Sequence, residues 1–502
     1  MTRFAKVIPI LIACAVSVRA AAQATDEAPP DAADVAGELT APPRDSARAA
    51  ELTRRAIRLI HDRDWKRAEA VLNEAVALAP EEPINLYNLA CVRAQLGQSD
   101  AAVDALERAA ATGFTDFVLL QRDPDLAPVR GLARYKTLVE KKGEWQRRSA
   151  ERLMAKLRDR LGEGYAYDID ADHKLIYAAS PEITTLAGLK DALQTQWRGQ
   201  RRELFATGPD AYVTVVVPSA ADYHRIMRYH NVGGAYFDAT KTLVAQRSGG
   251  VMRHEFTHAL HAADREPLGQ EHAAWVVEGL GVLYESAEIE SAEGGDVLVP
   301  LADNARLPAA AAAARRRGLV PLSTMLAMTP GEFMKRPNLT YAQAGSVMLY
   351  LRDRGLLRNF YEAYKRTYDA DPTGGRALEQ ASGMDVPAFE AAWTKWLLHR
   401  PPAPFAGGAA LFLGAQLAPA GGGMTVVLVA PNGPAAVAGL EPRDVILSVN
   451  GRPVKDYASL RPALGAYAPG KTVALRVRRG GKEFDADAKL QNISSAPTAA
   501  PQ

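Results

Sequence analysis

The chain has 502 residues, and a typical domain size of roughly 150 residues predicts about three domains. Hydrophobic residues make up 48% of it and charged residues 24%, a globular composition that excludes a wholly disordered chain, a collagen-like repeat and a protein with many membrane spans. The 60 lysines and arginines nearly balance the 58 aspartates and glutamates, and the net charge of +2 provides no broad basic surface. We therefore expect no nucleic-acid partner.

Residues 1–24 have the pattern of an export signal. Two basic residues precede an apolar stretch over residues 7–18, and residues 22–24 (Ala-Gln-Ala) supply the small side chains after which signal peptidases cut. The apolar stretch is too short to span a bilayer, so we expect no transmembrane span in the mature chain. The protein is therefore predicted to be exported, either periplasmic or secreted. A lipoprotein anchored at Cys14 is the alternative, because residues 11–14 (Leu-Ile-Ala-Cys) resemble a bacterial lipobox.

A helical repeat follows a leader over residues 25–45 that is predicted to be flexible from its Ala, Pro, Asp and Glu content. Three small or apolar positions recur 34 residues later: Ala68, Leu72 and Ala75 are followed by Ala102, Leu106 and Ala109. This period is typical of tetratricopeptide repeats, which residues 46–115 resemble. With a degenerate third unit, the resemblance implies an all-α repeat domain over residues 46–140. Such a domain either presents a docking surface to a protein partner or only braces the next domain.

The following segment mixes helices and strands. An exposed connecting helix is predicted over residues 141–161. The patterns beyond it predict strands over residues 165–179, a helix over 182–205, a buried strand over 211–217 and a hairpin over 236–246. Cys91, in the repeats, is expected to be a buried small hydrophobe, and no internal disulfide can form once Cys14 leaves with the signal.

His254-Glu255-Phe256-Thr257-His258 is the candidate catalytic motif. Two histidines at i and i+4 of a helix project from one face about 6 Å apart, which suits two ligands of one tetrahedral Zn²⁺ ion. Glu255 points beside such an ion, so its carboxylate can take a proton from a zinc-activated water as the general base. The motif therefore predicts a site for one Zn²⁺ ion.

A catalytic zinc site needs a third protein ligand and an open position. The acidic and histidine side chains after the motif are the candidates: Asp264, Glu266, Glu271, His272 and Glu278. Asp264 would point roughly 120° away from the ligand face if the helix continues, so we discard it. Glu278 lies in an apolar helix over residues 274–285, where a carboxylate is costly unless it coordinates or pairs.

Residues 249–285 resemble the gluzincin metallopeptidases, whose peptidase-MA-like members carry HExxH and, about twenty residues later, a W-x-x-E-G-x-A helix. Here the second element runs from Trp275 to Gly281. The resemblance implies an α+β zincin-like metallopeptidase domain over residues 141–400. It assigns the zinc ligands and the base to the following residues: His254, His258 and Glu278 as ligands, and Glu255 as base.

Two positions depart from the family pattern. Gly281 stands where the family usually has Ala, which is a mild change. Val282 stands where thermolysin-like members place a carboxylate that orients a ligand histidine. Glu285, two helical turns after Glu278, either substitutes for that carboxylate or is a solvent-facing charge.

Two flanking segments resemble the same superfamily. The hairpin over residues 236–246 corresponds to the edge strand that pairs with substrate backbone. Tyr341, at the start of a predicted helix over residues 340–354, resembles the tyrosine of a Y-A-Q-S/A segment. It is the candidate for stabilising the oxyanion, or else a structural tyrosine. His261 is expected to pack behind the ligands, whereas His224 and His230 are weak candidates for lining the cleft.

The C-terminal residues resemble a PDZ domain of the bacterial protease-associated type, predicted over residues 405–491 after a proline-rich linker. The matching segments are Leu413-Gly414-Ala415 at the carboxylate-binding turn, residues 433–440 as a small-residue helix, and residues 444–451 as a strand with an Asn-Gly turn. The resemblance implies a β-barrel-like domain. Its groove, beside a helix over residues 456–464, would accept protein C-termini, unless the domain only packs against the protease. Residues 492–502 are predicted to be a disordered tail.

Together these patterns predict a multidomain, exported, zinc-dependent peptidase whose repeat and PDZ modules dock a substrate or partner. Zn²⁺ would polarise the scissile carbonyl, Glu255 would deprotonate the attacking water and Tyr341 would hold the oxyanion. The alternative is a catalytically inactive envelope scaffold that binds protein partners, and a third possibility is a zinc enzyme that acts on another bond. The presence of the base and all three ligands weighs against the scaffold. The pattern is compatible with both an endopeptidase and an exopeptidase.

Overall fold

A computed structural model describes residues 18–22, 46–227, 232–290, 295, 297–300, 306–399, 413–420, 422–429, 433–456, 459–460, 463–464 and 470–490. The chain forms two compact units, one from residues 1–301 and 320–393 and the other from residues 302–319 and 394–502. The predicted leader, linker and tail lie outside the described residues, as does most of the predicted signal. No helix within the described ranges is both long and apolar enough to cross a bilayer.

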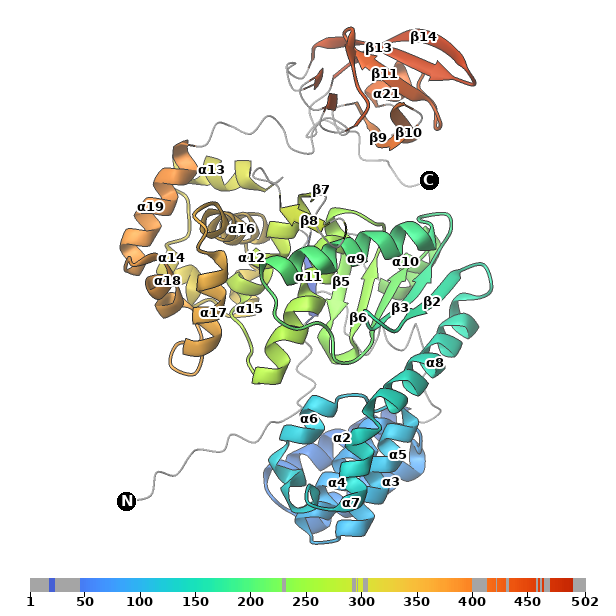
Figure 1. Ribbon diagram of the computed structural model, residues 1–502, viewed down its shortest axis with the longest axis vertical. Helices are drawn as coiled ribbons and strands as arrows, with labels where there is room; N and C mark the ends of the chain where they lie inside the picture. Colours follow the sequence, from blue (N-terminus) through green and yellow to red (C-terminus); the bar gives the residue numbers. More distant parts are fainter. Residues whose placement is uncertain are drawn as a thin grey trace. The chain divides into compact units, whose positions relative to one another are not determined.

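The first part of unit one is helical and is drawn in blue in Figure 1. Its elements are α2 (Ser46–His61), α3 (Trp65–Leu78), α4 (Pro83–Gln95), α5 (Ser99–Thr112), α6 (Phe117–Arg122), η1 (Pro124–Val129) and α7 (Ala133–Glu140). Helix α2 packs on α3, and α4 packs on α5. All six positions of the predicted repeat pattern are buried, so small side chains let these helices approach closely. The predicted helical N-terminal region is confirmed, and membership of the tetratricopeptide family stays a prediction.

Helix α8 (Lys142–Leu161) is more than the exposed connector that its charge pattern predicts. One stripe of it, with Ala150, Met154 and Leu157, is buried in a cluster with side chains of the sheet that follows. The opposite faces are charged and exposed, which dominates the composition of the segment. Because the apolar stripe is narrow and the other faces are charged, the average composition of the segment hides the packing face.

A six-stranded mixed sheet lies in unit one, with the strand order β1-β5-β6-β4-β3-β2. The strands are β1 (Val18–Ala22), β2 (Ala166–Asp170), β3 (Leu175–Ala179), β4 (Val213–Val217), β5 (Val232–Phe237) and β6 (Thr242–Ala245). Strand β4 runs parallel to β3 and β6, whereas β5 is antiparallel to β6 and to β1. Strands β3, β4 and β6 are buried along their whole length, as expected for continuous apolar runs covered on both faces.

Helices cover both faces of this sheet, and two of them carry the predicted metal ligands and base. Helix α10 (Ala220–Met227) shares a buried cluster with α8 on one face, and α9 (Leu186–Glu203) is drawn across the sheet in Figure 1. Helix α11 (Gly250–Arg265) packs on β5 and β6, and α12 (Ala274–Glu285) packs between α11 and α16 (Pro337–Asp353). A Cβ on Gly345 would come within 2.2 Å of Val282 Cγ1, so glycine is required where α12 and α16 meet.

Further elements complete unit one, and the last of them, α19, continues into the residues of unit two. They are η2 (Asp238–Thr240), η3 (Glu266–Leu268), β7 (Ala287–Glu290), β8 (Val297–Pro300), α14 (Leu322–Leu326), α15 (Pro330–Phe333), α17 (Leu357–Thr367), α18 (Gly375–Ser382) and α19 (Val386–His399). Helix α16 begins three residues before the predicted helix, because Pro337 is well suited to the first turn. The Arg122 side chain at the end of α6 donates to the carbonyls of Glu266 and Pro267, at 2.9 and 2.8 Å. The helical repeats are thereby tied to the loop that follows α11.

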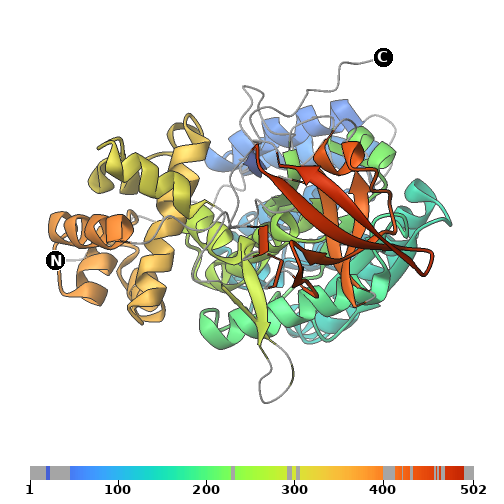
Figure 2. The ribbon, with the colours of Figure 1, turned by 90° about the horizontal axis from the view of Figure 1, so that it is seen from above.

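The second unit contains α13 (Leu307–Arg315) and an antiparallel six-stranded sheet, whose long C-terminal hairpin is dark red in Figure 2. Its elements are β9 (Ala415–Ala420), β10 (Gly423–Val429), α21 (Pro434–Val437), β11 (Val445–Val449), β12 (Arg452–Pro453), β13 (Thr472–Arg479) and β14 (Lys482–Lys489). Asn450 and Gly451 have φ values of +46° and +74°, as a tight two-residue hairpin turn demands. The predicted helix over residues 456–464 lies partly outside the described residues.

Candidate metal centre

Helix α11 carries the candidate catalytic motif through the interior of unit one. Gly249, with a φ of +129°, precedes the helix, and every residue from His254 to Asp264 is buried. His254 and His258, one turn apart, have ring centroids separated by 4.6 Å. So many polar groups in an interior helix require polar partners, because their desolvation is otherwise costly. These partners come from α12, β5 and the neighbouring helices.

Helix α12 brings Glu278 to both histidines. Glu278 is 3% exposed, and its Oε2 atom lies 3.2 Å from His254 Nε2 and 3.5 Å from His258 Nε2. The three ligand atoms lie within 4.8 Å of one another, and among the described residues no other group of three His, Cys, Asp or Glu side chains is arranged this closely. The structure therefore brings together the three residues predicted as ligands.

The arrangement fits a zinc ion. Tetrahedral zinc with donors at about 2.1 Å holds them roughly 3.4 Å apart, close to the separations of 3.2 and 3.5 Å between Glu278 Oε2 and the two imidazole nitrogens. Two imidazole nitrogens and one carboxylate oxygen form the three-ligand set of catalytic zinc sites, which keep a fourth position for water or substrate. The chemistry of the donors and their spacing therefore both suit Zn²⁺.

Glu285 completes the surroundings of the first histidine. Its Oε1 atom lies 2.9 Å from His254 Nδ1, and its side chain is 15% exposed. The interpretation of Glu285 as a solvent-facing charge is therefore wrong, because its carboxylate contacts His254. That it substitutes for the carboxylate absent at Val282 stays a prediction. When His254 Nδ1 donates to Glu285, Nε2 is left with its lone pair for a metal. Arg253 donates to the Tyr284 carbonyl at 3.2 Å and also to that of Glu285, which fixes the end of α12.

Gly281 allows the first histidine to sit against α12. A Cβ built on Gly281 would lie 2.6 Å from His254 Cε1 and 2.7 Å from Nε2. Carbon atoms in contact are normally about 3.5–4.0 Å apart, so no side chain fits there while His254 keeps its place. Gly281, where the sequence departs mildly from the family pattern that it resembles, therefore lies directly against the predicted ligand His254.

The electrostatics of the cluster favour positive charge. Burial alone lowers the pKa of His254, but hydrogen bonds with Glu278 and Glu285 outweigh it and raise that pKa to about 10. Burial raises the pKa of Glu278, but the charge of His258 and hydrogen bonds from both histidines hold that pKa well below its usual value. Zinc binding would therefore release a proton from His254, which makes zinc affinity depend on pH.

Glu255 lies beside the ligand cluster and is fully buried. Its Oε2 atom accepts a hydrogen bond from the backbone amide of Tyr236 at 2.9 Å. This contact connects the predicted base to β5, the strand predicted to pair with substrate. No sequence pattern indicated it, because the two residues lie on different elements and the donor is backbone.

Tyr341 also lies next to the histidines, but its hydroxyl has a different partner from the one predicted. Its ring stacks on His254, with centroids 6.0 Å apart and planes inclined by 24°. The hydroxyl donates to Met334 Sδ at 3.5 Å, and Tyr341 is fully buried. Its role in oxyanion stabilisation stays a prediction.

Asp264 points away from the predicted ligands, as expected, and binds groups of other elements instead. Its Oδ1 atom accepts from the amides of Ala206 and Thr207, at 2.8 and 3.0 Å. Its Oδ2 atom accepts from Lys365 Nζ at 3.0 Å and from Tyr361 at 3.1 Å. Burial raises the pKa of Asp264, but the hydrogen bond from the Thr207 amide and the charge of Lys365 together outweigh burial, so the pKa is lowered overall. This carboxylate joins the end of α11 to α17.

The other described histidines stay outside the predicted ligand cluster. His261 Nε2 lies 2.7 Å from His272 Nδ1, and His272 Nε2 lies 3.0 Å from Gln270 Oε1. His261 thus packs behind the ligands, as expected. His224 lies on α10, and His230 lies outside the described residues.

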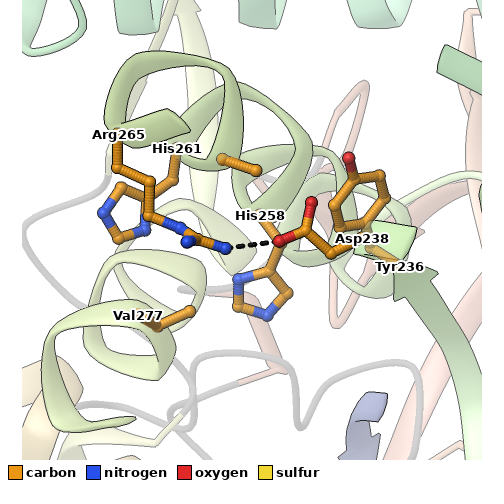
Figure 3. Close-up of a pocket in the computed structure, with 7 residues that line it drawn as sticks. Tyr236, Asp238, His258, His261, Arg265 and Val277 are labelled. Carbon is orange, nitrogen blue, oxygen red and sulfur yellow. Dashed lines mark hydrogen bonds and ion pairs between the residues drawn. The ribbon is translucent and has the colours of Figure 1, made fainter. Parts of the chain in front are cut away.

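A small cavity adjoins His258, and Figure 3 shows its walls. Its volume of about 10 Å³ is enough for roughly one water molecule. The lining side chains come from β5, η2, α11 and α12: Tyr236, Asp238, His258, His261, Ala262, Arg265 and Val277. Asp238 forms an ion pair with Arg265 across this space and another, at 3.0 Å, with Lys241. No sequence pattern indicates this pair, since its two residues are 27 positions apart and come together only on folding.

The predicted carboxylate-binding turn of the second unit has a glycine in the left-handed region. Gly414 has a φ of +63°, and a Cβ on it would come within 3.0 Å of Pro434 Cδ. The Leu413 carbonyl accepts from the Ala435 amide at 2.7 Å, which holds the turn against α21. Leu413 and Ala415 are buried. Peptide binding at this turn stays a prediction.

Curated relatives share only a short stretch with this chain. The periplasmic serine endoprotease DegP of Escherichia coli strain K12 is 39% identical over 72 residues, which are 14% of this chain and 15% of that protein. The serine protease Do-like HtrA of Lactobacillus helveticus is 42% identical over 69 residues, 14% of this chain and 17% of that protein. The chain thus spans less than a fifth of the length of either relative.

Solved structures and a family model also match. An aminopeptidase N family protein from Idiomarina loihiensis is 15% identical, with 66% of this chain and 68% of that one covered, but a TM-score of 0.26 does not establish a shared fold. A variant of the HtrA-type protease AlgW, solved with a decapeptide, is 25% identical over 18% of this chain and 30% of that one, with a TM-score of 0.16. Residues 412–490 match the PDZ domain family, so the C-terminal part of this chain is a PDZ domain.

Proposed function

We propose that this chain is an exported, zinc-dependent peptidase that hydrolyses peptide bonds at the cluster of His254, His258 and Glu278. The observation that carries the proposal is the position of Glu278 Oε2, 3.2 and 3.5 Å from the two imidazole nitrogens, with buried Glu255 next to them. When bound there, zinc would polarise the scissile carbonyl and make a water acidic enough to lose a proton near neutral pH.

Glu255 is proposed to move that proton. Its carboxylate takes the proton from the attacking water, whose oxygen bonds to the carbonyl carbon of the scissile peptide. The C–N bond then breaks, the water oxygen remains in the new carboxylate, and the proton passes from Glu255 to the leaving amine. The Tyr236 amide, 2.9 Å from Oε2, holds the carboxylate in place throughout.

Two further side chains position the ligands or stabilise charge. Glu285 fixes the ring of His254 and the tautomer that exposes its Nε2. Tyr341 keeps its proposed role beside the oxyanion, supported by the stacking of its ring on His254. A change of Tyr341 to Phe tests whether the hydroxyl contributes beyond packing.

The PDZ domain and the helical repeats are proposed to dock substrates or partners. The strand that begins after Gly414 can take an extended peptide as a further strand, with the C-terminus of that peptide at the turn. A peptide with a free C-terminus should bind, and the same peptide with an amidated C-terminus should not. Equal binding of both would exclude carboxylate capture at Leu413, Gly414 and Ala415.

A Glu255→Gln variant tests the catalytic proposal. The amide keeps the size of the side chain but cannot accept a proton, so hydrolysis of a casein or fluorogenic peptide mixture should fall by about 10²-fold or more. Zinc content should stay equal to that of the parent, because Glu255 is not one of the clustered ligands. Equal turnover by both proteins would remove Glu255 from the mechanism, and zinc-loaded protein that hydrolyses no peptide would favour the scaffold.

A further inference from the structure

Strand β5 passes directly beside the proposed catalytic base. The amide of Tyr236 in this strand donates to Glu255, and α11 packs along both β5 and β6. One side of β5 is paired with β6, from Gly234 opposite Ala245 to Phe237 opposite Thr242. Its other side is the position at which a further strand can be added next to the metal ligands.

A segment of the chain itself occupies that position. Strand β1 pairs antiparallel with β5, with Val18 opposite Phe237, Arg19 opposite Tyr236 and Ala20 opposite Ala235. The register shifts between Ala20 and Ala22, so the added strand is irregular beside the glycines of β5. This strand is internal, since the chain continues in both directions from it. The edge therefore accepts an extended segment that passes along it and has no end there.

The charges around β5 do not suit a chain terminus. An aminopeptidase must pair the terminal ammonium with a carboxylate, because leaving such a charge unpaired in a buried site is costly. Asp238, at the end of β5, is already paired with Arg265 and with Lys241. Among the described residues around the cluster, Glu278 contacts both histidines and Glu285 contacts His254.

The cations near the cluster are engaged as well, which argues against capture of a terminal carboxylate. Arg253 donates to the Tyr284 and Glu285 carbonyls. Arg265 contacts Asp238 and the Gln270 carbonyl, and Lys241 contacts Asp238 and Glu266. Asp238, Arg265 and Lys241 are therefore compensated by partners within the chain.

We infer that the site cleaves internal peptide bonds in an extended segment that pairs antiparallel with β5. The inference rests on the proposed peptidase function and specifies its substrate class: polypeptides presented in the middle, with no requirement for a free end. The predicted removal of residues 1–24 would take β1 away and leave this side of β5 open to such a segment.

Four forms of one ten-residue peptide test the inference with the predicted exported form of the chain, residues 25–502, loaded with zinc. The peptide is chosen from the fragments of a cleaved unfolded protein and made with free ends, with an acetylated N-terminus, with an amidated C-terminus, and with both ends blocked. Mass spectrometry locates the cleaved bond, and the Glu255→Gln variant shows which cleavage belongs to the site. All four forms should be cut at the same internal bond with kcat/KM values within about threefold of one another, since no buried terminal charge is at stake.

The outcomes separate the two proposals. Loss of about a hundredfold or more on blocking one end, or removal of residues one by one from that end, would overturn the inference and leave the peptidase function standing. Cleavage of none of the forms, nor of the parent protein, would overturn the function itself. A doubly blocked peptide with the sequence of residues 16–24 provides a second measurement. It should compete with the substrate or be cut. The absence of both inhibition and cleavage at millimolar peptide concentration would contradict the pairing with β5.

Discussion

Replacing Gly281 by alanine perturbs the proposed zinc site through a single methyl group. The added Cβ would lie 2.6 Å from His254 Cε1, whereas carbon contacts are normally about 3.5 Å or longer. Either the ring of His254 retreats by roughly 1 Å or α12 moves away from α11 by a similar distance. Both responses separate His254 Nε2 from Glu278 Oε2, which are now 3.2 Å apart.

The expected cost has two parts. Overpacking of a buried site typically destabilises a fold by about 1–3 kcal/mol. Disturbing the orientation of a metal ligand typically weakens metal binding by about 10- to 100-fold. Because Gly281 faces a ligand ring, we expect zinc affinity to fall within that range and activity at subsaturating zinc to fall with it.

Competition with a chromophoric chelator measures the zinc dissociation constant. The matched control is Gly143→Ala on α8, a helical glycine with no atom within 4 Å of its added Cβ. This control should bind zinc like the parent and be equal or slightly higher in stability, since alanine is the better helix former. Circular dichroism at a wavelength sensitive to helix content shows whether both variants are folded. A folded Gly281→Ala protein with the parent's zinc affinity would refute the placement of His254 against α12.

Three other changes test contacts that the structure shows. Glu285→Gln keeps the size of the side chain but removes the negative charge beside His254. It should weaken zinc binding by about 10-fold or more in the same chelator assay. Unchanged zinc affinity would mean that Glu285 acts only as a surface charge. Asp264→Asn should lower stability at neutral pH by on the order of 3 kcal/mol, because it breaks a buried pair with a lysine. Since the pKa of Asp264 is lowered in the folded state, its contribution to stability is present above the unfolded pKa of about 4 and is lost as pH falls through the folded pKa. The urea midpoints of variant and parent should therefore converge on acidification. A gap between the midpoints that stays constant with pH would contradict this. Asp444→Asn removes the charge that Arg479 contacts at 2.6 and 2.7 Å. Hydrogen exchange of the full chain should become faster in β11 and β13 but not in α11. An equal change of exchange rate in all three elements would contradict this.

The part of the site that the sequence predicts is the part governed by local geometry. His254 and His258 are one turn apart on a helix, so their convergence follows from helical periodicity alone. Glu278 needed two arguments, the cost of a carboxylate in an apolar helix and the family resemblance, because its approach depends on how α12 packs on α11. In the PDZ domain, Asn450 and Gly451 likewise specify their turn locally.

The remaining contacts could not be predicted because they join distant segments. Glu285 could equally have pointed to solvent, since the position of the α12 terminus relative to His254 is set by tertiary packing. The pairing of Asp238 with Arg265, and of the Tyr236 amide with Glu255, leaves no periodic pattern in sequence. The hydroxyl of Tyr341 contacts Met334, which a motif that describes only the tyrosine's own helix does not indicate.

The most direct test of the account is a crystal structure of the full chain with data collected on both sides of the zinc absorption edge. The proposed metal centre predicts one anomalous peak per chain, about 2.0–2.2 Å from His254 Nε2, His258 Nε2 and one Glu278 oxygen. Elemental analysis of the same protein should give one zinc per chain. A protein saturated with zinc that shows no peak between these three side chains, or shows one bound elsewhere, would contradict the proposed metal centre.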